Sequence, residues 1–219
     1  MTKRQQAIFD LLQNVPTTAD VGCDHGILSL NILERNISSK VIATDISAPS
    51  LQKTKDLLNS YNLASNAEFY CVDGLPRECK VDQILIAGMG GNEICKILSK
   101  YLSGREILPV LVLQPMRDFF KVRKMLMDFG YKIVVDKIIF DKKFYLLLKA
   151  EPGVQQCSTM QLYFGVIAQS YVEKDYQMWL DSQIQKANRI LPKIEHTDKY
   201  EDTKKFLQIC YSLKECKKC

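Results

Sequence analysis

The pattern of apolar and polar positions predicts short strands that alternate with helices over about two thirds of this chain. Apolar and β-branched runs predict strands at residues 18–21, 41–44, 68–72, 84–87 and 110–113. Apolar residues spaced by three and four predict helices at residues 28–34, 50–62, 93–102 and 119–129. Short apolar strands that alternate with helices indicate a parallel sheet with helices on both faces.

Two more strands, at residues 131–139 and 144–148, follow without a helix between them. They are joined by Asp141-Lys142-Lys143, so we expect a hairpin and one antiparallel strand at the end of the sheet. The chain therefore predicts an α/β fold, with a Rossmann-like doubly wound sheet of about seven strands.

The pattern changes at Glu151-Pro152-Gly153, after which no strand pattern occurs. Apolar residues then recur at spacings of three and four between Tyr176 and Ile194, as in a coiled-coil-like helix that Pro192 bends near its end. A second helical pattern covers residues 200–213. We expect a catalytic α/β domain at residues 1–151 and a helical hairpin at residues 152–219 that stands off it.

Composition places the chain among ordinary globular proteins, with 47% hydrophobic and 25% charged residues in 219. The longest apolar stretch, residues 107–113, is far shorter than the about 20 residues of a membrane-spanning helix. The first ten residues lack the apolar segment of a secretory signal. We therefore expect a cytoplasmic protein whose 8 cysteines are reduced thiols. A monomer is favoured, and self-association through the helical tail stays open as the alternative. Cys216-x-x-Cys219 supplies only two of the four ligands of a structural zinc site, so we expect no metal.

Positive charge gathers in one part of the chain. The formal net charge is only +5, but Arg117, Lys121, Arg123 and Lys124 cluster, and more lysines follow up to residue 143. This pattern predicts either a basic strip that binds nucleic acid or a solvated helix face.

Candidate ligand-binding residues follow three of the predicted strands. In open α/β sheets ligands bind outside the carboxyl ends of the strands. The first turn reads Asp20-Val21-Gly22-Cys23-Asp24-His25-Gly26, with Asp24 where a dinucleotide-binding turn has its second glycine. An acid there repels a pyrophosphate, which disfavours an NAD-dependent reductase, but suits the ammonium group of S-adenosylmethionine.

Asp45 and Asp73 follow the second and third strands. A carboxylate at Asp45 suits two ribose hydroxyls, and one at Asp73 suits the exocyclic amine of adenine. Either acid alone is also an ordinary turn residue. The coincidence of acids at three neighbouring strand ends predicts a nucleoside site.

The motifs ADVGCDHG, ATDIS, DGL, IAGMGG, LQP and KFY, in this order, resemble those of the bacterial tRNA (adenine22-N1)-methyltransferases. The resemblance runs from Arg4 to the helical tail. It implies S-adenosylmethionine as cofactor, tRNA as partner, and N1 of an adenine as the atom methylated.

Site residues are carried over from that family position by position. The implied cofactor shell is Asp20, Gly22, Cys23, Asp24, Asp45, Ile46, Asp73, Gly74, Gly88 and Gly90. The implied catalytic residues are Asp24, His25, Met89 and Gln114, and the implied substrate-binding residues are Arg4, Gly91, Pro115, Arg117, Lys121 and Lys143. Each of these polar side chains also has a plain structural interpretation, as a turn, capping or surface residue.

The chain departs from the family pattern after Asp24-His25, where Gly26-Ile27-Leu28-Ser29 replaces the usual Ala-Tyr-Leu-Pro. If that tyrosine stacks on the target adenine, another aromatic residue has to do so here. Three alternatives remain open: a methyltransferase for another RNA, one for a small molecule or protein, and a non-catalytic RNA-binding module.

Overall fold

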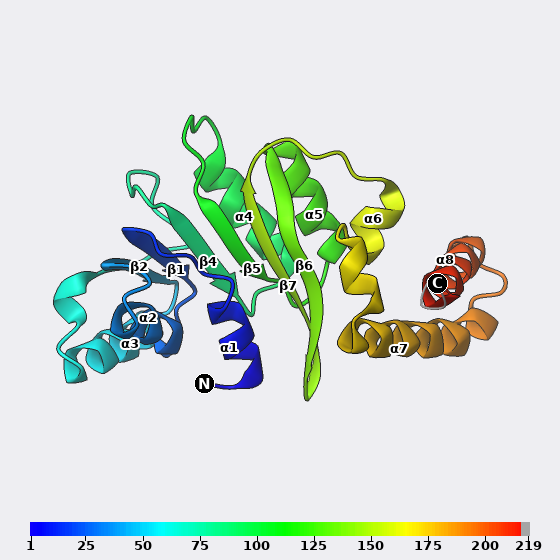
Figure 1. Cartoon of the computed structure of the whole chain (residues 1–219), viewed down its shortest axis with the longest axis horizontal. Coiled ribbons are helices and arrows are strands. Elements are labelled where there is room, and N and C mark those ends of the chain that lie inside the picture. Colours follow the sequence, from blue (N-terminus) through cyan, green and yellow to red (C-terminus); the bar gives the residue numbers. More distant parts are fainter. Residues whose placement is uncertain (216–219) are drawn as a thin grey trace.

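One seven-stranded sheet carries the fold, with helices on both of its faces (Figure 1). In the computed structural model residues 1–215 are described, with the backbone alone at residues 168 and 169. The strands are β1 (Thr17–Val21), β2 (Lys40–Asp45), β3 (Ala67–Cys71), β4 (Gln83–Ala87), β5 (Val110–Gln114), β6 (Tyr131–Asp141) and β7 (Lys143–Pro152). Their order across the sheet is β3-β2-β1-β4-β5-β7-β6. The predicted α/β fold is confirmed.

The predicted hairpin is also confirmed, and β7 is the one antiparallel strand of the sheet. It inserts between β5 and β6 and runs antiparallel to both, so β6 forms the edge and points the same way as β5. The carboxyl ends of β1, β2, β4 and β5 therefore share one edge of the sheet with the tip of the hairpin at Lys142, which extends beyond it (Figure 1).

Alternate strand residues face opposite helix layers. In β4, Ile84 and Ile86 belong to the hydrophobic cluster under α4 (Gly91–Leu102) and α5 (Phe119–Asp128). Leu85 between them belongs to the cluster under the other three helices. Those helices are α1 (Lys3–Phe9), α2 (Ile27–Glu34) and α3 (Ala48–Ser60). A strand buried on both faces needs apolar residues at every position, which explains its continuous run. The sequence pattern did not predict α1, which has only seven residues.

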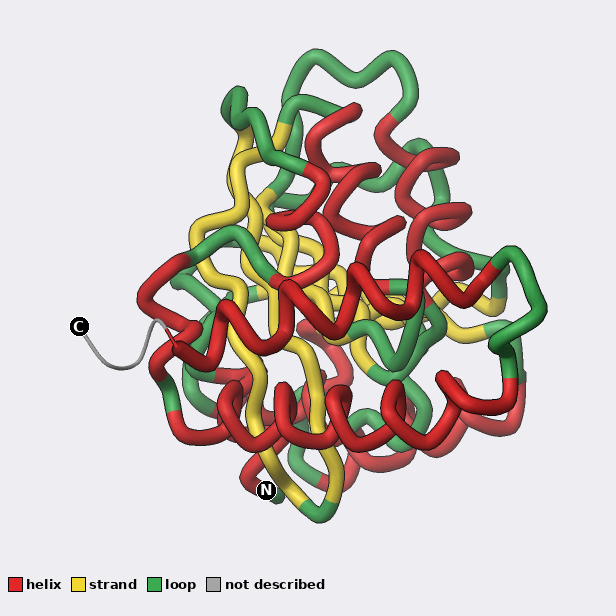
Figure 2. Tube along the Cα trace, turned by 90° about the vertical axis from the view of Figure 1, so that its right-hand side faces the viewer, coloured by secondary structure: helices red, strands yellow, loops and turns green. Residues whose placement is uncertain are grey.

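The C-terminal segment forms α6 (Thr159–Phe164), α7 (Lys174–Ile190) and α8 (Lys199–Glu215), with short 3₁₀ turns at 168–172 and 191–193. Another 3₁₀ turn, at 64–66, lies between α3 and β3. Figure 2 shows α7 and α8 side by side, joined by a loop. The helix predicted through Ile194 ends at Ile190, because Pro192 has no N–H to continue it. Cys216 and Cys219 lie outside the described residues.

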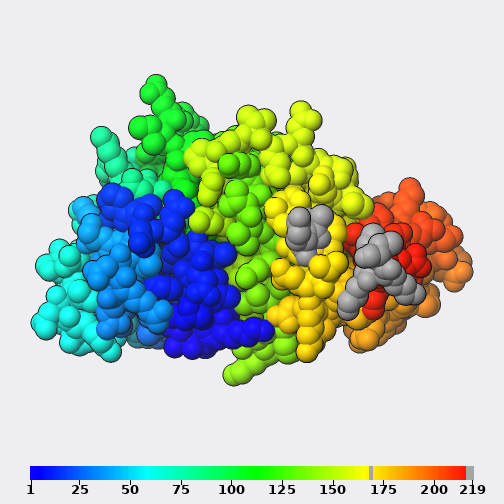
Figure 3. Space-filling view, in the orientation of Figure 1, coloured from blue at the N-terminus to red at the C-terminus, as the bar shows by residue number. Residues whose placement is uncertain are grey.

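The hairpin of α7 and α8 stands off the sheet less than the sequence predicted. Tyr176, Trp179 and Leu180 on α7 are buried and share one hydrophobic cluster with the sheet, and α7 packs against β6. The tail therefore rests on the edge of the sheet, with α8 at the end of the molecule opposite α2 and α3 (Figure 3).

One residue of the expected basic strip lies inside the protein. The Arg123 guanidinium donates from Nε and Nη2 to the two carboxylate oxygens of Asp136, both at 2.8 Å. Its Nη1 also donates to the carbonyl oxygens of Leu162 and Tyr163, while Asp136 accepts from the backbone N–H of Val166. Assigning Arg123 to the strip was wrong, because this pair joins α5 and β6 to the α6 segment.

Candidate active site

The loop after β1 has two glycines at positive φ and is held by backbone hydrogen bonds to β2. Gly22 has a φ of +76°, and a Cβ added there would lie 2.2 Å from Cε of Met89. At Gly26, with a φ of +72°, a Cβ would lie 2.9 Å from Cα of Thr54. The N–H groups of Gly22 and Cys23 both donate to the carbonyl oxygen of Thr44 at the end of β2. Both positions favour glycine because of their positive φ, and at Gly26 the Thr54 backbone also leaves no room for a Cβ.

Asp45, the last residue of β2, organises the neighbouring loops. Its Oδ2 accepts a hydrogen bond from the backbone N–H of Asp24 at 3.1 Å. Its Oδ1 accepts one from the N–H of Ser47 at 2.8 Å, at the start of α3. Each carboxylate oxygen can accept a further hydrogen bond, so Asp45 is oriented and can still bind hydroxyl donors.

A cavity of about 230 Å³ lies at the carboxyl ends of β1 and β2. It is lined by Val21, Gly22, Thr44, Asp45, Ile46, Val72, Asp73, Gly74, Met89, Glu93 and Ile97. The buried Thr44 hydroxyl has no hydrogen-bond partner within residues 1–215. A buried unpaired hydroxyl beside a cavity is a place for a polar ligand group. Five of the ten predicted cofactor residues line the cavity, together with the predicted catalytic residue Met89.

Asp73 lines the cavity but also makes an ion pair. Its Oδ2 lies 2.9 Å from Nζ of Lys96 on α4, and this bond lowers the pKa of the Asp73 carboxyl. Glu93 also approaches Lys96, at 3.9 Å. An adenine amine at Asp73 would therefore share the carboxylate with Lys96.

Asp20 lies beneath the loop rather than in the cavity lining. It is buried, and its Oδ2 accepts a hydrogen bond from the Ser29 hydroxyl at 2.6 Å. Burial raises the pKa of the Asp20 carboxyl to about 6. Burial likewise raises the pKa of the Cys23 thiol to about 12, so Cys23 is a neutral group that accepts from the Thr54 hydroxyl.

Asp24 and His25 are exposed to solvent. Asp24 has a φ of +49°, and its side chain is 70% exposed. Its Oδ2 lies 3.7 Å from Nε2 of His25. The two side chains are available to a large substrate that covers this loop.

A second cluster of predicted residues surrounds Arg4. Nε of Arg4 donates to Oε1 of Gln114 at 2.8 Å, and its Cζ lies 5.2 Å from the ring centre of Tyr145 on β7. Its Nη2 would lie 3.1 Å from a Cβ on Gly88. Nζ of Lys143 lies over the same tyrosine ring, at 5.3 Å. The cluster therefore joins the N-terminal helix to the ends of β4, β5 and β7.

Gln114 is buried, and both ends of its amide are engaged. Its Nε2 donates to the carbonyl oxygen of Pro115 at 3.0 Å, while its Oε1 holds Arg4. Pro115 is buried as well. The side chain of Gln114, an implied catalytic residue, is thus hydrogen-bonded within the protein, and the donor that it orients is the partly buried Arg4.

Arg117 lies against the glycines after β4. A Cβ on Gly90 would lie 3.1 Å from Nε of Arg117, and the N–H of Gly91 donates to the Arg117 carbonyl oxygen at 3.1 Å. Nζ of Lys121 donates to Oδ1 of Asn92 at 2.9 Å. The structure thus brings most of the predicted residues together in three adjacent groups: the cavity, the Arg4 cluster and the Arg117 segment. Asp20 and Cys23 are instead buried, and Asp24 and His25 lie exposed on the loop after β1.

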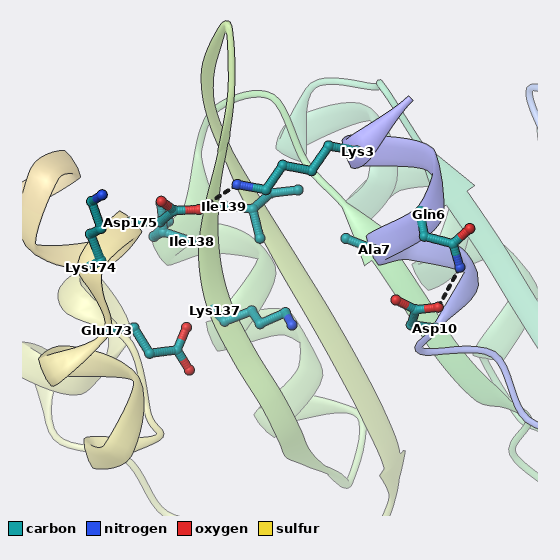
Figure 4. Close-up of a pocket in the computed structure, with 10 residues that line it drawn as sticks. All are labelled: Lys3, Gln6, Ala7, Asp10, Lys137, Ile138, Ile139, Glu173, Lys174 and Asp175. Atoms are coloured by element: carbon teal, nitrogen blue, oxygen red, sulfur yellow. Dashed lines mark hydrogen bonds and ion pairs between the residues drawn. The ribbon is translucent and has the colours of Figure 1, made fainter. Parts of the chain in front are cut away.

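Another groove, of about 510 Å³, lies between α1, β6 and the start of α7 (Figure 4). Nζ of Lys3 lies 3.1 Å from Oδ2 of Asp175, and Nε2 of Gln6 donates to Asp10. Asp175 also accepts from the N–H of Phe140. The groove is lined by residues outside the predicted set, and its mixed charges join the tail to the hairpin.

Sequence reasoning missed two site residues. Tyr145 belongs to the KFY motif, but only Lys143 of that motif was predicted as a site residue. An aromatic residue close to a cation in the sequence was the signal that could have identified Tyr145. Thr44 was treated as an ordinary strand residue. Only the structure shows that its hydroxyl is unpaired within residues 1–215.

Neither a metal-binding cluster nor a membrane-spanning helix is found in the described part of the chain. Residues 1–215 contain no group of three or more His, Cys, Asp or Glu side chains placed to hold a metal ion. Among these residues, none of the helices has the length and apolar character that a membrane crossing requires. The six described cysteines are free thiols.

Comparison with known proteins places the chain in a family. Residues 1–148 match the family model of a methyltransferase domain. A candidate tRNA methyltransferase of Mycoplasma pneumoniae is 30% identical over 184 residues, which are 80% of this chain and 84% of that protein. The tRNA (adenine(22)-N(1))-methyltransferase of Bacillus subtilis is 31% identical over 160 residues, 70% of this chain and 66% of that protein.

Solved structures share the whole architecture. A candidate m1A22 tRNA methyltransferase of Streptococcus pneumoniae superposes with a TM-score of 0.90 at 23% identity, covering 97% of this chain and 99% of the other. Its complex with S-adenosyl-L-methionine gives a TM-score of 0.88 at 24% identity, with the same coverage. These likenesses show the fold, including the helical tail. From the family model and the sequence relatives, this chain belongs to the methyltransferase domain family, in the group of the bacterial tRNA (adenine22-N1)-methyltransferases.

Proposed function

We propose that this protein transfers the methyl group of S-adenosylmethionine to N1 of adenine 22 in tRNA. One observation carries the proposal: the cavity bounded by Asp45 and Thr44 ends at Met89, and the glycines after Met89 lie against the exposed cation Arg117. A nucleoside site and a nucleic-acid-binding side chain thus meet at one loop. The family of the chain supports the same reaction.

The cavity residues fit the nucleoside half of the cofactor. Asp45 is oriented by two backbone N–H groups and can accept from both ribose hydroxyls. The exposed apolar side chains of Ile46 and Val72 line the cavity and suit the faces of an adenine ring. The unpaired Thr44 hydroxyl provides a further polar contact. At Gly22 the absence of a side chain lets Met89 pack directly against the backbone of the loop after β1.

The reaction needs no strong general base. The cofactor supplies a methyl group on a sulfonium sulfur; N1 of adenine donates its lone pair to that carbon, and the carbon–sulfur bond breaks with its electrons going to sulfur. The neutral base needs no deprotonation, so the protein acts mainly by alignment, with the reacting atoms about 3–3.5 Å apart.

The positive charge that develops on the adenine calls for a carboxylate nearby. Asp24 is the proposed group, with His25 beside it as a hydrogen-bonding partner for the base. Tyr145 is the proposed stacking residue in a chain that has Ile27 at the usual tyrosine position. Gln114 positions Arg4, and Arg4 contacts the RNA at the same edge.

RNA binding is proposed for two surfaces. Arg117, Lys121 and Lys143 contact phosphates near the target adenine, and the C-terminal helices contact the tRNA body. Exposed lysines on α8, among them Lys204 and Lys205, support the second surface because cations bind the phosphate backbone without sequence preference. The two parts divide at about residue 151, as the sequence pattern predicts.

Labelled methyl transfer to tRNA transcripts tests the function. A transcript with adenine at position 22 is expected to accept methyl groups, and the same transcript with guanine there is expected to accept none. Equal labelling of both would overturn the site assignment. Calorimetry with S-adenosylhomocysteine and with NAD separates a cofactor failure from a substrate failure, since only the first ligand is expected to bind.

A further inference from the structure

A pocket of about 390 Å³ lies between the first turn of α5 and α6. It is lined by Arg117, Asp118, Phe119, Phe120, Lys121 and Tyr163. Three aromatic side chains, two cations and the carboxylate of Asp118 therefore surround one hollow. The proposed function so far uses only its cations, Arg117 and Lys121.

The rings of Phe120 and Tyr163 form a pair whose outer member faces solvent. Their centres are 4.5 Å apart, and the ring planes meet at 38°. Tyr163 is 51% exposed, whereas Phe120 is partly buried. Within residues 1–215 no hydrogen bond engages the Tyr163 hydroxyl. Phe120 thus supports Tyr163 from behind and leaves part of the tyrosine ring free to contact another molecule.

The cations stand next to these rings. The Arg117 side chain is 79% exposed, with Nε 3.7 Å from Oδ2 of Asp118. Lys121 is exposed and is oriented by Asn92. Aromatic faces beside cations are the chemistry that binds single-stranded nucleotides, since the ring stacks on a base while the cations contact phosphates.

The pocket lies next to the cofactor cavity. Arg117 lines it and at the same time lies against Gly90, next to Met89 of the cofactor cavity. Only the short Met89–Gly91 loop separates the proposed methyl donor from the pocket. A nucleotide held here would be a neighbour of the adenine being methylated.

We propose that this pocket binds the base of a nucleotide flanking the target adenine, stacked on Tyr163. This inference rests on the proposed function, because it takes RNA as the substrate. Removing an adenine from the tRNA core breaks its stacking on its neighbours. A protein ring that stacks on the exposed neighbour replaces part of the stacking lost, so Tyr163 favours the opened tRNA. Stacking of this kind tolerates any base.

Replacement of Tyr163 tests the proposal. Tyr163→Ala and Tyr163→Leu are expected to lower kcat/KM for tRNA by roughly 5- to 150-fold, the range of one base–aromatic stack. The Leu variant keeps apolar contact with Phe120 but has no aromatic face, so a mere packing role predicts near-normal activity for it. Tyr163→Phe keeps the face and is expected to behave like the wild type. Affinity for S-adenosylhomocysteine is expected to stay unchanged in all three.

Tyr61 provides a matched control. It is 49% exposed and follows α3, at the opposite edge of the sheet. Tyr61→Ala is expected to leave kcat/KM for tRNA unchanged. Urea unfolding of each variant checks that the fold is retained.

A binding measurement separates this proposal from the proposed function. Transcripts with 2-aminopurine at position 21 or 23 are mixed with protein and S-adenosylhomocysteine. Quenching at one position with the wild type, and its loss with Tyr163→Leu, would support the pocket. If the wild type methylates adenine 22 but all Tyr163 variants match it in rate and quenching, the pocket proposal is overturned and the function stands. If the wild type binds no tRNA, both are overturned.

Discussion

Arg4 in α1 donates a hydrogen bond from Nε to Oε1 of Gln114, the last residue of β5, at 2.8 Å. The Gln114 amide is fixed in this orientation because its Nε2 donates to the carbonyl oxygen of Pro115. A donor near the start of the chain is thereby held at the loop after β4, next to Gly88. The short N-terminal helix is part of the candidate site rather than an appendage to the sheet.

Arg4→Ala is expected to lower kcat/KM for tRNA by about 10-fold or more, because a hydrogen bond to a charged group contributes about 1.5–3 kcal/mol. Affinity for S-adenosylhomocysteine is expected to change less than about twofold, as Arg4 lies outside the cavity lining. Gln114→Leu is expected to reproduce part of the loss by releasing Arg4. Methyl transfer kinetics and calorimetry measure both effects.

Arg35 supplies the matched control for Arg4. It is exposed, and its Cζ lies 4.7 Å from the ring centre of Phe9, so it also stacks on an aromatic ring. Arg35→Ala is expected to keep normal kinetics. Equal losses in the two alanine variants would assign the effect to general charge rather than to the position of Arg4.

Asp45→Ala is expected to weaken binding of S-adenosylhomocysteine by about 10- to 150-fold, from the loss of charged acceptors for the ribose. The change also frees the N–H groups of Asp24 and Ser47, so the two loops lose their common anchor. Asp45→Asn keeps one acceptor and is expected to give an intermediate result. Asp128→Ala is the control, because it removes an exposed partner of Lys124 on α5. Calorimetry is expected to give this variant the wild-type affinity for S-adenosylhomocysteine.

The buried Asp20 makes stability depend on pH in an unusual direction. Its carboxyl has a pKa of about 6 in the folded protein, against 3.8 in the unfolded chain. Between these values the folded state binds more protons, so this group contributes stability as pH falls from 7 to 4. At 1.36 kcal/mol per pKa unit, the contribution is about 3 kcal/mol.

Asp20→Asn isolates this contribution because Asn is neutral and its carbonyl oxygen can still accept from Ser29. The variant is expected to be more stable than the wild type at pH 7, with the difference vanishing near pH 4. Urea unfolding at a series of pH values measures it. A difference that stays constant across this range would show that Asp20 does not titrate there.

Arg123→Met is expected to destabilise the protein by about 3–5 kcal/mol, since it leaves the Asp136 carboxylate buried without its partner. Both side chains of this pair are 2% exposed. Lys124→Ala, at the neighbouring exposed position, is expected to change the free energy of unfolding by less than about 0.5 kcal/mol. Similar values for the two variants, measured by urea unfolding, would contradict the buried pair.

The sequence predicted the sheet well because its strands are buried on both faces and therefore read as continuous apolar runs. Residues 84–87 and 110–113 each lie within a strand of the structure. The hairpin was predictable from two strand patterns joined by three polar residues. By contrast, α1 has seven residues, too few for a helical period to stand out, and it is held by contacts with distant strands.

The sequence predicted those site residues that are marked by a glycine in a turn or by an acid at the end of a strand. Gly22, Asp45 and Gly74 were found in this way, and all three line the cavity. Side-chain partners between distant elements were not predictable: the pairing of Arg123 with Asp136 and of Asp73 with Lys96 depends on the assembled fold. The Thr44 hydroxyl and the ring of Tyr145 likewise acquire their roles only from what surrounds them.

The most direct test identifies the methylated nucleoside and its position. A tRNA transcript with adenine 22 is treated with protein and S-adenosylmethionine, digested, and analysed by mass spectrometry. The expected product is 1-methyladenosine, released from the fragment that contains position 22 and from no other. A methyl group on N6 of adenine, or on any other nucleotide, would contradict it.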